Sequence, residues 1–215
     1  MLARAVLSLF LCGSVTCAVA ADQPVATCTL TDHLDRNWEH ELVFYPVPEN
    51  VFGREDLTLL GPDDKPTVFQ WVPAEIAASG KKSLAFFATV AAFGNAVYRL
   101  VPGTPVRDTD LRVSDSPCAV TLENRLTGIR LGGPAAGTDG PLAGIRLASG
   151  RWVGGGQLTS PLKPLRQTVQ TLARGPVFAE ALVTYEFPNF CYCRVRVRLP
   201  AAEPVAGVGG ECLRP

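Results

Sequence analysis

The chain lacks an excess of charge of either sign. Its 215 residues include 20 lysines and arginines and 20 aspartates and glutamates. Residues 1–21 carry only Arg4, so the remainder has 19 basic and 20 acidic residues, a net charge of −1. Such a balance disfavours nucleic acid or an anionic membrane as the main partner. After residue 21 the sequence also lacks an apolar run long enough to cross a bilayer.

The sequence motifs of common catalytic sites are missing as well. There is no HExxH, GxSxG or GxxxxGKS/T motif and no pair of CxxC motifs. The glycine run 154–156 lacks the strand-to-helix context of a phosphate-binding loop. The sequence therefore predicts no cofactor and no metal, and it leaves catalytic residues unknown.

Histidine is scarce, with only His33 and His40. Both lie in the segment DHLDRNWEH (32–40), whose carboxylates could help to bind a cation, and either histidine could act as a base. The interpretation that we favour is a polar lead-in segment in which Trp38 docks on a sheet.

Two carboxylate pairs have the composition that glycosidases place across a cleft. They are Asp63 with Asp64, and Asp108 with Asp110. Aspartates in such turn-rich segments more often form turns, and we favour that interpretation for both pairs.

Residues 1–21 have the pattern of a secretory signal peptide. Arg4 is the basic residue, an apolar run follows, and Ala18-Val19-Ala20 provides a small-x-small cleavage site. The mature chain is then expected to start at Ala21 or Asp22, in a secreted, periplasmic or cell-envelope location. An uncleaved anchor is the alternative, although the run is short for a membrane span.

Five cysteines remain after this segment, namely Cys28, Cys118, Cys191, Cys193 and Cys212. In an exported protein they are candidates for disulfide bonds. Cys191 and Cys193 share one strand face, so a bond between them would be strained. We expect any bridge from this pair to run to one of the other three. A Cys-x-Cys metal site is the alternative, which the lack of a nearby histidine disfavours.

The clearest pattern in the chain is the alternation of apolar and polar residues over residues 177–199, which predicts two half-buried strands. A turn around Pro188-Asn189 joins them. A three-residue loop (188–190) keeps both faces intact and pairs Tyr185 with Cys193 and Glu180 with Arg198. A five-residue loop is the alternative. The apolar face needs a second sheet to cover it.

The rest of the chain shows many short strand patterns separated by Gly, Pro and Asp turns. It predicts an all-β, antiparallel sandwich. We expect a polar lead-in over residues 22–41, a first strand at 42–47, a strand at 67–72 and a buried strand at 84–92. The predicted organisation is a signal peptide (1–21), a small β-domain (22–105) and a β-sandwich (106–215), although one continuous sandwich is also compatible with the pattern.

Aromatic and arginine side chains supply the candidates for carbohydrate binding. Trp152, beside Arg151, could stack on a sugar ring. The side chains of Arg194, Arg196 and Arg198 should project from one sheet face and could bind the carboxylates of an acidic polysaccharide. A solvated face paired with Glu180 across the strands is the favoured alternative for these arginines.

Short motifs along the chain resemble a known group of proteins. They are DHL (32–34), ELV (41–43), GPDDKP (61–66), VFQ (68–70), FFA (86–88), YRL (98–100), VTLEN (120–124), GPV (175–177) and VTYEF (183–187). Their order resembles the accessory β-modules of secreted carbohydrate-active enzymes. The nearest are the N-terminal region of rhamnogalacturonan exolyase-like (YetA-like) proteins and the β-sandwich after the catalytic domain of family-38 α-mannosidases. The resemblance implies a small β-barrel or sandwich followed by part of a mutarotase-like super-sandwich.

The resemblance transfers no catalytic residue, because the metal-binding domain of family-38 enzymes has no counterpart in this sequence. We therefore expect an exported, non-catalytic β-sandwich module associated with polysaccharide binding or degradation. The alternatives are the N-terminal fragment of a polysaccharide lyase or glycoside hydrolase, and an envelope structural or protein-interaction domain.

Overall fold

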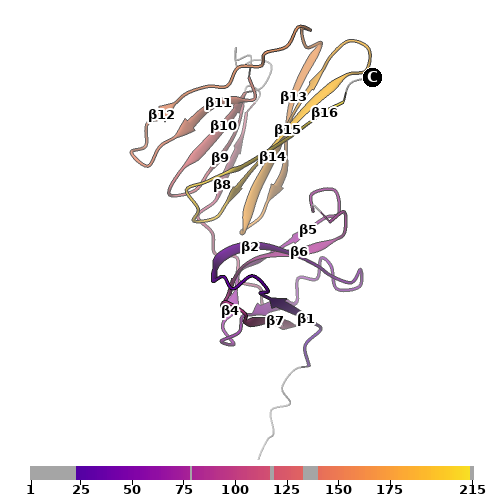
Figure 1. The fold of residues 1–215 in the computed structure, drawn as a ribbon, viewed down its shortest axis with the longest axis vertical. Helices are drawn as coiled ribbons and strands as arrows, with labels where there is room; N and C mark the ends of the chain where they lie inside the picture. Colours follow the sequence, from indigo (N-terminus) through magenta and orange to yellow (C-terminus); the bar gives the residue numbers. More distant parts are fainter. Residues whose placement is uncertain (1–22, 78, 117–118, 133–139, 214–215) are drawn as a thin grey trace, which may run out of the picture.

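The computed structural model describes residues 23–77, 79–116, 119–132 and 140–213. All regular structure in these residues is β, in four antiparallel sheets, which confirms the predicted all-β class. No helix in the described part of the chain could span a bilayer. Figure 1 shows the sheets as two pairs, stacked one above the other along the long axis.

The first pair of sheets is built from residues 26–102. Sheet A has the order β1-β7-β3-β4 and sheet B the order β2-β6-β5. The strands are β1 (Ala26–Thr31), β2 (Trp38–Pro46), β3 (Leu57–Leu60), β4 (Pro66–Thr67), β5 (Phe69–Val72), β6 (Ser83–Val90) and β7 (Asn95–Pro102). Their inward side chains form one core, in which Leu57, Leu59, Leu84, Phe86 and Leu100 are fully buried.

The second pair of sheets is built from residues 112–213. Sheet C has the order β12-β11-β10-β9-β8 and sheet D the order β13-β14-β15-β16. The strands are β8 (Arg112–Asp115), β9 (Ala119–Glu123), β10 (Gly128–Gly132), β11 (Leu142–Arg146), β12 (Trp152–Val153), β13 (Arg166–Arg174), β14 (Phe178–Glu186), β15 (Tyr192–Pro200) and β16 (Gly207–Leu213). The two sheets enclose a second core that includes Leu122, Leu131, Val183, Tyr185 and Leu199.

The hairpin predicted over residues 177–199 is confirmed in its register. Strands β14 and β15 pair Tyr185 with Cys193 and Glu180 with Arg198, as a three-residue loop requires. The turn closes through a hydrogen bond from the Phe187 amide to the Cys191 carbonyl oxygen. The odd-numbered residues of β14 face sheet C, which supplies the expected second layer.

A third apolar cluster, which we call the junction, joins the two pairs of sheets. Val72 and Ala85 of sheet B pack against Val177 and Phe178 at the start of β14. The buried side chain of Gln70 accepts the amide hydrogens of Val177 and Phe178 through Oε1, at 3.2 and 3.0 Å. Whether residues 22–105 and 106–215 fold as separate domains stays a prediction.

Two expectations about the strands are wrong. Residues 22–41 are not only a lead-in, because β1 pairs along its whole length with β7, and β2 already begins at Trp38. Only Cys28 of β1 is buried, so the strand carries little apolar signal and is fixed by pairing with β7. The expected strand at 67–72 is divided at Val68, since Thr67 pairs in sheet A and Phe69 in sheet B.

The predicted polar segment at 32–40 is organised by Asp32, a buried carboxylate. Its oxygens accept hydrogen bonds from Trp38 Nε1 at 2.7 Å and from the amides of Leu34, Arg36 and Phe93. These bonds, led by that of Trp38, lower the pKa of the Asp32 carboxyl. The favoured interpretation of this segment is confirmed for Trp38, which packs against the first core.

An Asp32→Asn variant should report this stabilisation through its pH dependence. A carboxyl with a lowered pKa stabilises the fold at pH values above its unfolded-state pKa of about 3.9. This stabilisation is lost as the pH falls towards the folded-state pKa. The variant should therefore melt at least about 2 °C below the wild type at pH 7, with a smaller gap at pH 3. Thermal melts followed by circular dichroism between pH 3 and 7 measure this. A gap independent of pH would contradict the assignment.

Candidate functional cleft

A cleft of about 580 Å³ lies beside the junction, between the two pairs of sheets. Five polar and aromatic residues of its lining come from four separate parts of the chain. These residues are His40, Phe87, Asp108, Asp110 and Arg125. His40 and the pair Asp108/Asp110 are candidates by residue type alone, and the fold brings them together in this cleft. The volume lies within the range of about 300–1,000 Å³ that is common for small-ligand sites.

His40 forms one wall of the cleft because β2 is irregular at this point. The register of β2 against β6 shifts between Trp38 and Glu41, and His40 has a φ of 54°, in the left-handed region. Its imidazole stacks on the Phe87 ring, with centroids 4.1 Å apart and planes at 7°. The His40 side chain is still 55% exposed, with Nε2 3.9 Å from Glu203 Oε1. The stack therefore gives the cleft a flat, accessible ring surface.

Asp110 is fixed in the opposite wall by backbone donors. Its two carboxylate oxygens accept the amide hydrogens of Ala202, at 3.0 Å, and of Arg125, at 3.1 Å. Partial burial acts to raise the pKa of this carboxyl, but the two amides and the nearby Arg125 guanidinium lower it below its ordinary value. Asp110 is thus held as an anion. It is unsuitable as the general acid of a glycosidase, because that acid must carry a proton.

Asp108 and Arg125 are the accessible charged groups of the cleft. Both residues are exposed, and the Arg125 side chain keeps 79% of its surface although its Nε lies 3.5 Å from Asp110. Exposed groups of this kind can exchange their hydrogen bonds to water for hydrogen bonds to a polar ligand. No sequence pattern indicates Arg125, because its place in the cleft depends on the loop after β9 meeting the segment before β8.

A second hollow of about 540 Å³ shares Thr109, Asp110 and Arg125 with the cleft. It continues onto the outer face of sheet C, where Arg146 Nε lies 2.9 Å from Glu123. Arg112 also lines this hollow. The cleft and this hollow are therefore adjacent parts of one surface.

Trp152, a predicted sugar-binding residue, lies on the same outer face of sheet C. Its indole covers two glycines: a Cβ at Gly128 would lie 3.2 Å from the ring and one at Gly144 3.4 Å away. The Arg130 guanidinium stacks on the ring, 4.4 Å from its centroid, and Trp152 is half-buried. Arg151 is exposed next to it. Sugar binding by Trp152 and Arg151 stays a prediction.

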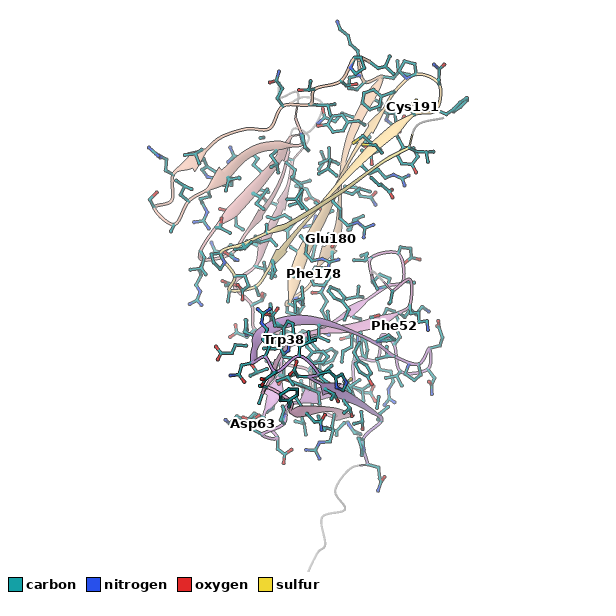
Figure 2. All side chains as sticks on the ribbon, in the orientation of Figure 1. Trp38, Phe52, Asp63, Phe178, Glu180 and Cys191 are labelled. Carbon is teal, nitrogen blue, oxygen red and sulfur yellow. The ribbon has the colours of Figure 1, made fainter. Side chains whose placement is uncertain are left out.

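The three arginines of β15 are engaged in ion pairs. Fully buried Glu180 binds Arg196 Nη1 at 3.1 Å and Arg198 Nε at 2.5 Å, while Arg194 pairs with exposed Glu211. Arg198 also lies 4.6 Å from the ring centroids of Phe44 and Phe178. Figure 2 shows Glu180 and Phe178 at the base of the upper sheets, next to the junction. The cross-strand pairing of Glu180 with Arg198 is confirmed, and glycan binding by these arginines stays a prediction.

The other candidates lie apart from the cleft. Asp63 and Asp64 sit in the turn between β3 and β4, where Asp63 pairs with Lys65 at 2.8 Å. Cys28, Cys191, Cys193 and Cys212 are free thiols, so no disulfide is present among the described residues, and Cys118 lies outside them. Burial raises the pKa of Cys28 to about 11. Within the described ranges, no cluster of three His, Cys, Asp or Glu side chains could hold a metal ion.

Comparison with known proteins gives a likeness in structure but none in sequence. No protein-family model and no curated protein matches the sequence. Among solved structures, the chain is similar to a protein in glycosyl hydrolase family 38 from Enterococcus faecalis, with a TM-score of 0.44 and 12% identity. The match covers 84% of this chain and 29% of that one, so the chain spans less than a third of its length.

Proposed function

We propose that this chain is an exported, non-catalytic β-sandwich module that binds polysaccharide in the cleft between its two pairs of sheets. The observation that carries the proposal is the composition of the cleft, which combines a stacked ring surface with exposed polar groups. Sugars have apolar C–H faces that pack on rings and hydroxyls that hydrogen-bond to carboxylates and guanidinium groups.

Each wall of the cleft has a distinct role in this proposal. The stack of His40 on Phe87 offers a ring surface to one face of a sugar. Asp108 accepts hydrogen bonds from hydroxyls, and Arg125 donates to hydroxyl or carboxylate oxygens. Asp110 holds the wall in place, because its carboxylate ties the amides of Arg125 and Ala202 together.

The lowered pKa of Asp110 argues against this residue as the general acid of a hydrolase. A hydrolase of the usual kind needs one carboxyl with a raised pKa as the acid, and Asp110 has the opposite shift. We therefore place the lyase or hydrolase fragment second. Release of new chain ends from any polysaccharide incubated with the protein would favour this enzyme alternative.

Binding to immobilised polysaccharides tests the proposal. The mature chain, starting at residue 22, should bind at least one member of an array of neutral and acidic plant and algal polysaccharides. A folded sample that binds none of them would overturn the proposal. Co-purification with a protein and not with a glycan would favour the third alternative, an envelope structural or protein-interaction domain.

Variants in the cleft, on sheet C and on sheet D locate the bound glycan. Asp108→Ala and Arg125→Ala should each weaken binding, whereas Arg194→Ala, on the face of sheet D, should leave it unchanged. Trp152→Ala tests the sequence-based alternative on sheet C. A loss with Trp152→Ala and none with the cleft variants would move the site to the outer face of sheet C.

A further inference from the structure

Cys193 and Cys212 lie directly opposite each other on neighbouring strands. Residue 193 of β15 is the register partner of residue 212 of β16, so the two side chains lie on the same face of sheet D. The other described cysteines are placed differently. Cys28 is buried in the first core, and Cys191 lies in the β14–β15 turn, which Figure 2 shows at the far end of the molecule.

The hydrogen-bond pattern of sheet D shows that this pair has a geometry suited to a disulfide. At the two ends of the hairpin, the Phe187 amide bonds to Cys191 and the Ala201 amide to Val177. The register between these two hydrogen bonds has no shift, so the odd-numbered residues of β15 direct their backbone N–H and C=O groups to β14 and not to β16. Cys193 therefore faces β16 in a non-hydrogen-bonded pair, where Cα atoms are about 4.5 Å apart. Disulfides span Cα distances of about 4.4–6.8 Å.

The two thiols differ in their access to solvent. Cys212 is exposed, as is every residue of β16. Cys193 is half-buried against the second core, and this burial, together with contact with the Cys212 thiol, raises the pKa of Cys193 to about 11. An oxidant from solution therefore meets Cys212 first.

We propose that Cys193 and Cys212 form an oxidation site at which a disulfide links β15 to β16. The oxidant is a small-molecule or protein disulfide of an oxidising compartment. The Cys212 thiolate attacks it and releases one thiol, and the Cys193 sulfur then attacks Cys212 in the mixed disulfide and releases the second. Two protein thiols are oxidised as one disulfide is reduced to two thiols. This proposal depends on the expected export of the chain to an oxidising compartment, and it does not depend on glycan binding.

The bond would fix a strand that has few other contacts. Strand β16 is an edge strand, contains Gly207, Gly209 and Gly210, and buries none of its residues. Glycine in a strand lowers its stability, since more backbone freedom is lost on ordering. The disulfide would remove part of that freedom in the unfolded chain and also protect an exposed sheet edge.

Oxidation of the mature, reduced chain with oxidised glutathione tests the site. The expected product is lighter by two hydrogen atoms, its proteolytic map joins the peptides of Cys193 and Cys212, and its Tm is about 5 °C or more above that of the reduced chain. Cys212→Ser should abolish this product, whereas the control Cys191→Ser should retain it. A map that joins Cys212 to Cys118 or Cys191, or a folded chain that forms no internal bond, would overturn the proposal.

Discussion

Replacing Glu180 by glutamine is expected to lower the free energy of unfolding by about 3 kcal/mol. The carboxylate is fully buried, and it forms ion pairs with Arg196 and Arg198 at 3.1 and 2.5 Å. An amide of the same shape fills the site but leaves both guanidinium groups without a counter-charge, and its NH₂ group faces other donors. Chemical denaturation followed by tryptophan fluorescence measures the loss.

The exposed pair Arg194–Glu211 provides the matched control on the same strand. Its side chains keep 44% and 63% of their surface, so Glu211→Gln should change stability by no more than about 0.5 kcal/mol. Equal effects of Glu180→Gln and Glu211→Gln would contradict the central role of the buried carboxylate. The comparison separates the burial of charge from the mere presence of an ion pair.

Replacing Gly175 by alanine is expected to destabilise the junction by about 2–3 kcal/mol. A Cβ at this position would overlap the side-chain amide of Gln70. Gln70 cannot simply rotate away, because its buried Oε1 accepts the amide hydrogens of Val177 and Phe178. Moving it would leave two buried amides without a partner. Equilibrium denaturation in urea measures the change.

Gly209→Ala serves as the control for this substitution. Nothing lies within 4 Å of a Cβ at Gly209, and its φ is not in the left-handed region, so the variant should retain wild-type stability or gain slightly. A Gly175→Ala variant as stable as the wild type would contradict the importance of the close packing of Gln70 on Gly175 for the junction.

The sequence predicted best where a strand is half-buried and has a clear turn. The alternation over residues 177–199 allowed one register that kept both faces intact, and the β14–β15 pairing has that register. By contrast, β1 and β8 are short and have few buried residues, and β1 depends on pairing with β7, which is distant in the sequence. Local pattern carries little information about such strands, since tertiary pairing decides them.

The cleft could be predicted only in part, for a similar reason. His40, Asp108 and Asp110 stand out by residue type, but no sequence spacing indicates that β2 and the segment before β8 meet. Arg125 and Phe87 had no signal, because an exposed arginine after a strand and a phenylalanine within one are common. The arginines of β15 show the reverse case: their regular spacing suggests a binding surface, but Arg196 and Arg198 form ion pairs with Glu180.

We expect polysaccharide to bind in the cleft lined by His40, Asp108 and Arg125. Calorimetric titration of the best-binding polysaccharide into the wild type and the Asp108→Ala, Arg125→Ala and Arg194→Ala variants tests this site. We predict that Asp108→Ala raises Kd about tenfold, equivalent to about 1.4 kcal/mol, while Arg194→Ala leaves Kd unchanged. An unchanged Kd for a folded Asp108→Ala variant, together with an unchanged Kd for Arg125→Ala, would contradict the claim.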